Sequence, residues 1–361
     1  MPAIVKTMCS LRARLLAAQL VVAVAFVLGH GPAWAASREP APLFTSNDVL
    51  HLTLAMPVRT IVARKKQRPK LAGKLSYMGK DGKPVELDVK VTTRGHSRLE
   101  ICSFPPLKLN FKRTQVAGTL FAGQNKLKLS TDCMSSRRYQ DYLQLEYVIY
   151  RIYEQLTPLS FRVRSVEMTY IDTASRRNRS ETGHGFLVED IKGVAARAGM
   201  RVAKQKTVAR SALDPEQLAL LSVFEYMIGN TDWSAISPEA GSDCCHNAAV
   251  IVPRNGSGKG VDVPYDFDQA GMIDTEYALP DKRLPIRSVR DRLYRGLCSG
   301  NSYLQAIVSR FDAARPKIEA LFQTVSVMDS SRREAMRYLA DSYAIIDDAA
   351  QRQKQIVAHC R

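Results

Sequence analysis

The strongest constraint on the fold is a series of short segments, between residues 44 and 130, in which apolar and polar residues alternate. This period of two is typical of strands that bury one face of a sheet. Two more such segments, RVRSVEMTYID and GHGFLVEDI, flank the arginine-rich turn TASRRNRSET. The earlier strands are predicted at VLHLTLAM, KLAGKLSYMG, PVELDVKVTTRG, PLKLNFKR and NKLKLS. We therefore expect an antiparallel sheet in this half of the chain.

Two segments have strong helical patterns. Residues 137–156 carry apolar side chains at helical spacing, and we expect this helix to pack beside the sheet. In LDPEQLALLSVFEYMIGN, Asp214 is a good N-cap, Pro215 suits the first helical position, and Gly229 can end the helix. The residues NTDW, at positions 230–233, are then predicted to follow directly after the C-terminal end of this second helix.

The remainder of the chain contains two strand patterns, NAAVIVP and GVDVPYDFD, and helical patterns at about 303–323 and 330–357. The predicted fold class is α+β. We expect two lobes in one compact unit, a sheet-rich lobe over 36–195 followed by a helical lobe over 196–361.

The N-terminus has the features of a secretory signal peptide. Basic residues precede the apolar run LLAAQLVVAVAFVLG, which is followed by the small-x-small triplet Ala33, Trp34 and Ala35. We predict that residues 1–35 are removed. A retained anchor is the alternative, although the run is short for a bilayer span of about 20 residues. The mature protein is expected to be periplasmic or secreted, with no integral membrane segment.

Cysteine usage agrees with export. Of the seven cysteines, Cys9 lies in the predicted leader, and the other six are an even number in an oxidising compartment. Three disulfides are possible, but six cysteines allow 15 pairings. Cys244 and Cys245, in a loop before Asn247, are expected to pin that loop by disulfides. A metal–thiolate site at DCCH, residues 243–246, is the alternative.

The mature chain is strongly basic. The sequence has 52 Lys and Arg against 35 Asp and Glu, and the leader contains three of the basic residues and no acidic one, which leaves a net charge of +14. This charge indicates either a solvated surface or a face that binds polyanions, such as nucleotide phosphates or acidic peptides. No basic motif is interleaved with aromatic residues, so we expect no specific nucleic-acid binding.

Several motifs occur in an order that resembles the CotH kinase family, secreted or spore-coat relatives of the protein kinases. GNTDW follows an apolar helix, Asn247 enters a later strand, and VPYDFDQAG comes after it. Upstream, TTRGHS precedes PLKLNF, and GFLVED ends in acidic residues. The resemblance covers about residues 90–275. It implies an atypical protein-kinase-like two-lobed fold and phosphoryl transfer from ATP with Mg²⁺ or Mn²⁺.

The resemblance also implies roles for particular residues. Asp232 would be the catalytic base that accepts the proton of the acceptor hydroxyl, and Asn247, Asp266 and Asp268 would hold the metal ions. Without the resemblance, Asp232 could be a turn residue, and the two later aspartates could be a strand-end pair or a calcium site.

A second group of residues would face the nucleotide. Lys108 would pair with the phosphates, and Glu146 on the neighbouring helix would hold this lysine in place. The nucleotide-binding residues implied by the resemblance are Arg94, Lys108, Glu146 and Glu189. Asn230 and Trp233 complete the motif around Asp232, with Trp233 expected mainly to pack.

Three functions are compatible with these features. The first is an exported kinase-like phosphotransferase whose acceptor is a Ser, Thr or Tyr of an envelope protein or a small hydroxyl compound. The second is an inactive relative that binds nucleotide or another polyanion. The third is a metal-stabilised structural or interaction protein of the envelope.

Overall fold

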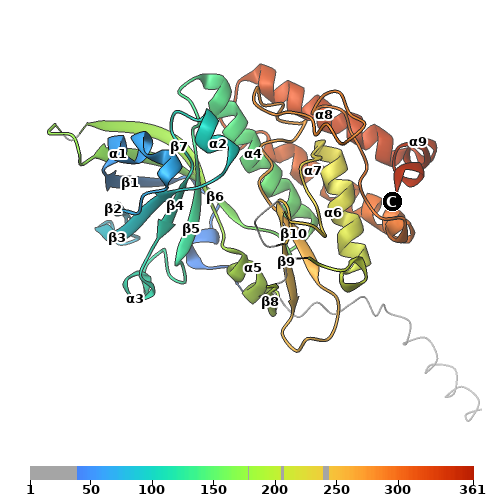
Figure 1. Ribbon diagram of the computed structural model, residues 1–361, viewed down its shortest axis with the longest axis horizontal. Helices are drawn as coiled ribbons and strands as arrows, with labels where there is room; N and C mark the ends of the chain where they lie inside the picture. Colours follow the sequence, from blue (N-terminus) through green and yellow to red (C-terminus); the bar gives the residue numbers. More distant parts are fainter. Residues whose placement is uncertain (1–38, 178, 205–206, 239–243) are drawn as a thin grey trace, which may run out of the picture. The chain divides into compact units, whose positions relative to one another are not determined.

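The computed structural model describes residues 39–177, 179–204, 207–238 and 244–361. The predicted signal peptide, residues 1–35, lies outside the described residues. Across the four described ranges, no helix has both the length and the apolar character needed to cross a membrane. These ranges form a mixed α+β structure, which confirms the α+β part of the predicted fold (Figure 1).

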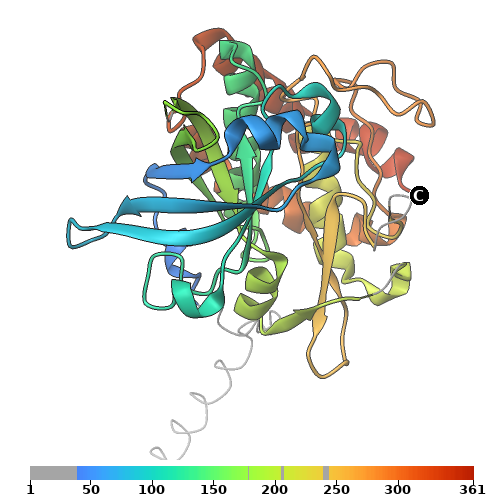
Figure 2. The ribbon, with the colours of Figure 1, turned by 60° about the vertical axis from the view of Figure 1, so that its left-hand side comes forward.

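Seven strands form a closed barrel in the order β1-β2-β3-β4-β5-β7-β6 (Figures 1 and 2). Neighbouring strands are antiparallel except β1 and β6, whose parallel pairing closes the barrel. The expected antiparallel sheet is therefore present, and the parallel contact of β1 with β6 joins the two edges that an open sheet would leave free. The strands are β1 Leu50–Met56, β2 Leu71–Met78, β3 Pro84–Thr93, β4 Leu107–Asn110, β5 Lys126–Thr131, β6 Val163–Asp172 and β7 Ser180–Val188.

Inward side chains fill the barrel because the strands keep their period of two. In β3, Leu87, Val89 and Val91 are buried, and the charged residues between them are exposed. The close pairing of β7 with β5 depends on Gly185, where a Cβ would lie 2.6 Å from the carbonyl oxygen of Ser130. A larger residue at this position would push the two strands apart.

The rest of the described chain contains a small sheet and most of the helices. The sheet has the order β10-β9-β8, with β8 Met200–Val202, β9 Ala248–Pro253 and β10 Val261–Pro264. The helices are α1 Val58–Ala63, α2 Ser97–Ile101, α3 Arg113–Val116, α4 Arg137–Leu156, α5 Ile191–Arg197, α6 Pro215–Ile228, α7 Leu304–Leu321, α8 Asp329–Asp347 and α9 Ala349–Gln355. The predicted strands and long helices are all present, whereas α1, α2, α3, α5 and β8 are too short to show a period in the sequence.

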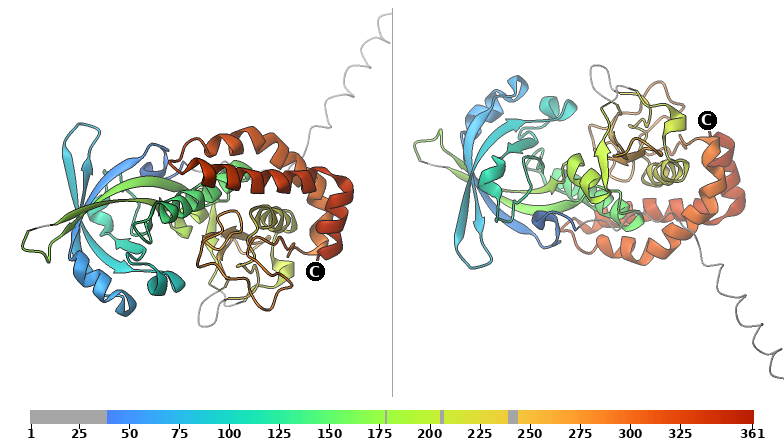
Figure 3. Two further views of the ribbon diagram at one scale, coloured as in Figure 1. Left: turned by 90° about the horizontal axis from the view of Figure 1, so that it is seen from above. Right: turned by 90° about the horizontal axis from the view of Figure 1, so that it is seen from below.

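Helix α4 joins the two halves of the structure. It packs against β6 and β7 on the outside of the barrel and against α7 on its other side (Figure 3). Most of its side chains are buried, which explains why apolar residues recur on more than one face. The barrel has its own apolar core, and a second, larger core surrounds α4 and α6.

The ends of the C-terminal helices follow from local caps. The carboxylate of Asp214 accepts a hydrogen bond of 2.9 Å from the Gln217 N–H at the start of α6. We predicted one helix over 330–357, but the structure divides it at Asp348. This residue has an extended backbone, and its carboxylate accepts from the Gln351 N–H and so begins α9.

The six cysteines outside the predicted leader form three disulfides, Cys102–Cys133, Cys244–Cys245 and Cys298–Cys360. Disulfides of this number agree with an oxidising compartment. The expectation that Cys244 and Cys245 pin their loop to the rest of the protein was wrong, because these neighbours bond to each other. Contacts of His246 and Asn247, the next two residues in the chain, hold this part of the chain instead.

Asp262 on β10 is a buried acid in an apolar setting. Its side chain is 3% exposed, and neither carboxylate oxygen has a hydrogen-bond partner within the described residues. Burial raises the pKa of Asp262 well above its ordinary value. The folded chain therefore binds this proton more tightly than the unfolded chain does.

Folding stability should depend on pH through this group. Its stabilising contribution is present below the ordinary carboxyl pKa and is lost as pH rises through the raised value. We expect the free energy of unfolding to be lower at about pH 8 than at about pH 5, and Asp262→Asn to reduce this difference. Urea denaturation at both pH values measures the effect. Asp312→Asn, on an exposed site of α7, should keep the parent's pH dependence, and an Asp262 variant that also keeps it would contradict the prediction.

Candidate functional site

The chain reverses direction directly after α6, and the turn positions Asp232. Gly229 takes a left-handed conformation with φ of 67°, and the Asn230 N–H donates to the Glu225 carbonyl. The side-chain oxygen of Asn230 then accepts a hydrogen bond of 3.0 Å from the Asp232 N–H. Asn230 is 1% exposed, so it serves as a buried support of this turn.

Asp232 meets a second segment of the chain through its carboxylate. Its Oδ1 lies 2.6 Å from Nε2 of His246, and its Oδ2 accepts a hydrogen bond of 3.0 Å from Nδ2 of Asn247. The same Nδ2 donates to the Asp232 carbonyl at 2.7 Å. The structure thus brings together two motif residues that are separated in sequence, Asp232 and Asn247.

His246 is a site residue that the sequence did not reveal. Its position in DCCH suggested only a metal–thiolate alternative, and the two cysteines in fact form a disulfide. The sequence signal that could have pointed to this residue is its place directly before Asn247. Only the folded structure shows its contact with Asp232.

Asp266 lies beside this pair. The N–H of Tyr265 donates to the Asn247 carbonyl at 2.9 Å, which places the residue next to Asp266 against the start of β9. The N–H of Asp266 donates to the hydroxyl of Tyr150 on α4, and its backbone has a φ of 66°. Two independent contacts therefore hold the backbone around Asp266.

The charges around Asp266 keep it ionised. Burial opposes ionisation, but Arg94 and Arg98, together with Lys128, more than compensate and lower the pKa of Asp266 below its usual value. His246 acts in the same direction. Asp266 is therefore a partly buried carboxylate surrounded by cations.

Asp268 has a different environment from Asp266. Nε of Arg98 donates to Asp268 at 2.8 Å, and Nη2 of Arg98 donates to Glu146 at 2.5 Å. All three side chains are buried. Burial raises the pKa of Glu146 to about 7, although Arg98 opposes this shift. We expected Glu146 to hold Lys108, but its partner in the structure is Arg98, which ties α2, α4 and the segment after β10 together.

Two lysines extend from neighbouring strands of the barrel. Lys108 on β4 lies opposite Lys128 on β5 in the strand register. Nζ of Lys128 lies 4.1 Å from the centre of the Tyr265 ring, and burial, with repulsion by Arg94, lowers the pKa of this lysine to about 8. Burial also lowers the pKa of Lys108, with repulsion by Lys126. Of these two lysines, Lys128 is the one whose charge lowers the pKa of Asp266. Its position therefore suits the cation that was expected at Lys108.

Arg94 completes the cationic side of the cluster. Its Nη2 donates to the hydroxyl of Ser130 on β5 at 3.2 Å. It lowers the pKa of both Asp266 and Lys128. Arg94, which TTRGHS suggested as a nucleotide-binding residue, therefore lies near Asp266.

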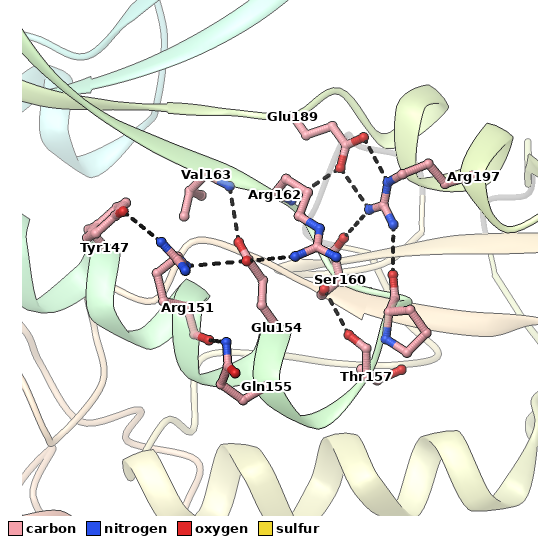
Figure 4. Close-up of polar contacts among 11 residues, drawn as sticks. Tyr147, Arg151, Glu154, Gln155, Thr157, Ser160, Arg162, Val163, Glu189 and Arg197 are labelled. Atoms are coloured by element: carbon pink, nitrogen blue, oxygen red, sulfur yellow. Dashed lines mark hydrogen bonds and ion pairs between the residues drawn. The ribbon is translucent and has the colours of Figure 1, made fainter. Parts of the chain in front are cut away.

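Glu189 lies in a separate network (Figure 4). Arg197 donates to it through Nε at 3.2 Å and through Nη2 at 2.9 Å, and the Arg162 N–H donates to its Oε2. The side chain is 2% exposed. These bonds anchor α5 to the ends of β6 and β7, so the carboxylate is already fully engaged and the expectation that it contacts nucleotide is not supported by its position.

Trp233 packs rather than pointing into the cluster. It is 5% exposed and belongs to a small apolar core with Leu218 and Val250. Nη1 of Arg295 donates to the carbonyls of Thr231 and Trp233 at 2.5 and 2.6 Å, and its guanidinium lies over the Trp233 ring. Arg295 and Trp233 therefore hold the loop that carries Asp232.

Two residues of this cluster carry oxygen atoms of the kind that a hard divalent cation takes as ligands. Asp266 offers an ionised carboxylate, and both side-chain hydrogen bonds of Asn247 use Nδ2, which leaves its amide oxygen available in the described chain. The described ranges contain no group of three or more His, Cys, Asp or Glu that could hold a metal ion. Mg²⁺ commonly takes one or two protein carboxylates and completes its shell with phosphate and water, so these two ligands are compatible with it. Asp268 is the weaker candidate because Arg98 already neutralises it.

No known family model matches this chain, and no curated protein matches it.

Proposed function

We propose that this protein is an exported kinase-like phosphotransferase that moves the γ-phosphoryl group of ATP to a hydroxyl acceptor. The observation that carries the proposal is the convergence of Asp232 and Asn247 with the ionised Asp266, next to the cations Arg94 and Lys128. Phosphoryl transfer requires such a set: a carboxylate for the attacking hydroxyl, ligands for a metal ion, and cations for the phosphates.

The order of the motifs supports a relative of the CotH kinase family. The closed barrel differs from the open sheet expected of a kinase-like N-terminal lobe, so the proposed kinase-like fold is an atypical one. The proposed lobe boundary between residues 195 and 196 falls inside α5, the helix that follows the barrel and precedes the small sheet. The leader pattern and the disulfides support a periplasmic or secreted location.

In the proposed reaction, Asp232 orients the acceptor hydroxyl and accepts its proton. Asn247 and His246 keep the carboxylate in one orientation through their contacts with its two oxygens. Lys128 and Arg94 offset the negative charge of the phosphates. A bound Mg²⁺ or Mn²⁺ would be held by Asp266 and Asn247 and would neutralise phosphate charge. The acceptor would be a Ser, Thr or Tyr hydroxyl of an envelope protein, or that of a small compound.

One observation favours a second candidate, an inactive relative that binds nucleotide or another polyanion. Both carboxylate oxygens of Asp232 already have a partner, His246 on one side and Asn247 on the other. A carboxylate held in this way is a weaker acceptor for a proton. The cationic cluster of Arg94 and Lys128 would still bind phosphate.

Lys128→Met provides the test of the nucleotide site. The protein is expressed from the full sequence, purified after export with its disulfides formed, and heated with ATP and Mn²⁺. We expect the parent to gain thermal stability from ATP and Mn²⁺ and to incorporate label from γ-labelled ATP, and Lys128→Met to lose both responses. Without ligand, the variant should be more stable than the parent by on the order of 1–2 kcal/mol at pH 7, because a partly buried lysine with a lowered pKa disfavours folding while protonated.

Lys126→Met is the matched control, since Lys126 lies on the same strand but is exposed. It should keep the nucleotide response of the parent. A thermal response without label in the parent would favour the second candidate. If ATP and Mn²⁺ have no effect on the parent, both proposals fail.

A further inference from the structure

A segment of the barrel carries charge of only one sign. Every Lys, Arg, Asp or Glu between residues 49 and 80 is basic, and six of these residues lie within 59–70. We call residues 59–70 the basic segment. It forms most of α1, the short 3-10 helix Lys65–Gln67, and the turn that leads into β2.

Much of this charge is not neutralised. Within the described residues, Arg59 pairs with Asp172 and Lys66 pairs with Glu100. The other four cations have no acidic partner in the described ranges; they are Arg64, Lys65, Arg68 and Lys70. Arg64, Arg68 and Lys70 are exposed.

The hydrogen bonds of the basic segment connect it to the candidate site without removing its charge. Nη2 of Arg68 donates to the Gly95 carbonyl at 2.7 Å, and the hydroxyl of Thr93 donates to the Lys65 carbonyl at 2.7 Å. Arg94, whose charge lowers the pKa of Asp266, lies between Thr93 and Gly95 in the sequence. The basic segment also packs against α2, which carries Arg98, and α1 and α2 lie on the same side of the barrel (Figures 1 and 2).

We propose that the basic segment is a docking surface for an acidic polypeptide segment of the acceptor protein. Its charge is complementary to such a partner, and it adjoins the turn that carries Arg94. A peptide bound there would lie beside the turn that carries Arg94, and a Ser, Thr or Tyr next to its acidic residues would reach the neighbourhood of the candidate site. This part of the inference rests on the proposed phosphotransferase function, whereas the binding itself does not.

The geometry favours a peptide over an anionic membrane. The uncompensated charges follow one short stretch of chain, and this stretch ends at the turn beside the candidate site. A membrane-binding face relies on a broad basic surface together with apolar side chains that enter the lipid. The exposed residues from 63 to 70 are charged or polar apart from one alanine.

The test compares two triple variants with the same change in charge. In the first, Arg64, Arg68 and Lys70 are each changed to Gln. In the control, Arg333, Arg337 and Lys354 on exposed positions of α8 and α9 are each changed to Gln. A double variant, Arg64→Gln with Lys70→Gln, keeps the Arg68 bond to Gly95 and guards against a local change in structure. Fluorescence anisotropy measures binding of a labelled peptide of alternating Glu and Ser, without ATP, to exported full-chain protein.

We expect the first triple variant to bind the peptide about ten-fold more weakly than the parent, the double variant to be intermediate, and the control to stay within about two-fold. Binding by the parent should weaken strongly at about 1 M salt, where the Debye length is about 3 Å. Equal losses in the two triple variants would overturn the proposal, because only net charge would then matter. The proposal would be overturned in favour of a membrane if the first triple variant lost binding to phosphatidylglycerol vesicles but bound the peptide as well as the parent does.

The two proposals fail in different ways. Peptide binding that depends on the basic segment, with no label transferred from ATP, would leave the docking surface standing and remove the phosphotransferase. If the parent and the first triple variant transfer label to the peptide equally, the phosphotransferase stands and the docking surface is removed.

Discussion

Replacing Arg98 with methionine is expected to lower the free energy of unfolding by about 3–5 kcal/mol. The Arg98 guanidinium lies between the carboxylates of Glu146 and Asp268, and the three side chains are 9%, 2% and 9% exposed. Methionine has a similar length but no charge, so the variant leaves two buried acids without their cation. Urea denaturation of the disulfide-intact protein at pH 7 measures the loss.

Two further variants make this result specific. Arg59→Met removes an arginine whose side chain is 67% exposed in its ion pair with Asp172, and it should change stability by no more than about 1 kcal/mol. Adding Glu146→Gln and Asp268→Asn to Arg98→Met should recover part of the loss, because the buried charges are then removed together. A similar loss in the Arg59 and Arg98 variants, or no recovery in the triple variant, would mean that the buried charges do not control stability here.

Asp232→Asn is expected to reduce the rate of label transfer from ATP by about 10²–10⁴-fold, the range for loss of a general base. Asparagine has the same shape and can keep a contact with His246 or Asn247, but it cannot accept the proton of the acceptor hydroxyl. Nucleotide binding should remain within about two-fold of the parent, because Lys128, Arg94 and Asp266 are unchanged. Single-turnover transfer and the thermal response to ATP with Mn²⁺ separate the two effects.

Asp312→Asn provides the control for this variant, as an exposed aspartate on α7 outside the cluster. It should transfer label at the rate of the parent. If Asp232→Asn also keeps the parent rate, Asp232 is only a turn residue and the proposed mechanism is wrong. Loss of both transfer and nucleotide binding would show instead that the residue supports the structure of the site.

The secondary structure was largely predictable because local patterns decide it. The alternation in PVELDVKVTTRG marks β3, and the spacing of apolar residues in 137–156 gives the bounds of α4. Asp214 and Gly229 mark the two ends of α6 through their own backbone and side-chain chemistry. The short helix α2 has too few residues to show a period, so the sequence did not predict the element that carries Arg98.

The candidate site was predictable in part. Asp232, Asn247, Asp266 and Arg94 were proposed from motifs, and the structure brings them to one neighbourhood. The choice between two lysines on alternating strands was not predictable, because both have the same local pattern. Burial and the nearby Asp266 distinguish Lys128 from Lys108 only after the barrel has formed.

The sequence by itself determined the longer strands, the positions of most long helices, the even set of cysteines and the order of the acidic motifs, because each depends on neighbours in the chain. Tertiary structure alone decided the parallel contact that closes the barrel, the pairing of Cys244 with Cys245, and the partner of Glu146. The physical reason is that burial and charge pairing depend on distances across the fold. The residues next to a carboxylate in the sequence do not show which partners it has in the fold. Glu189 is paired with an arginine, whereas Asp266 lies ionised among several cations.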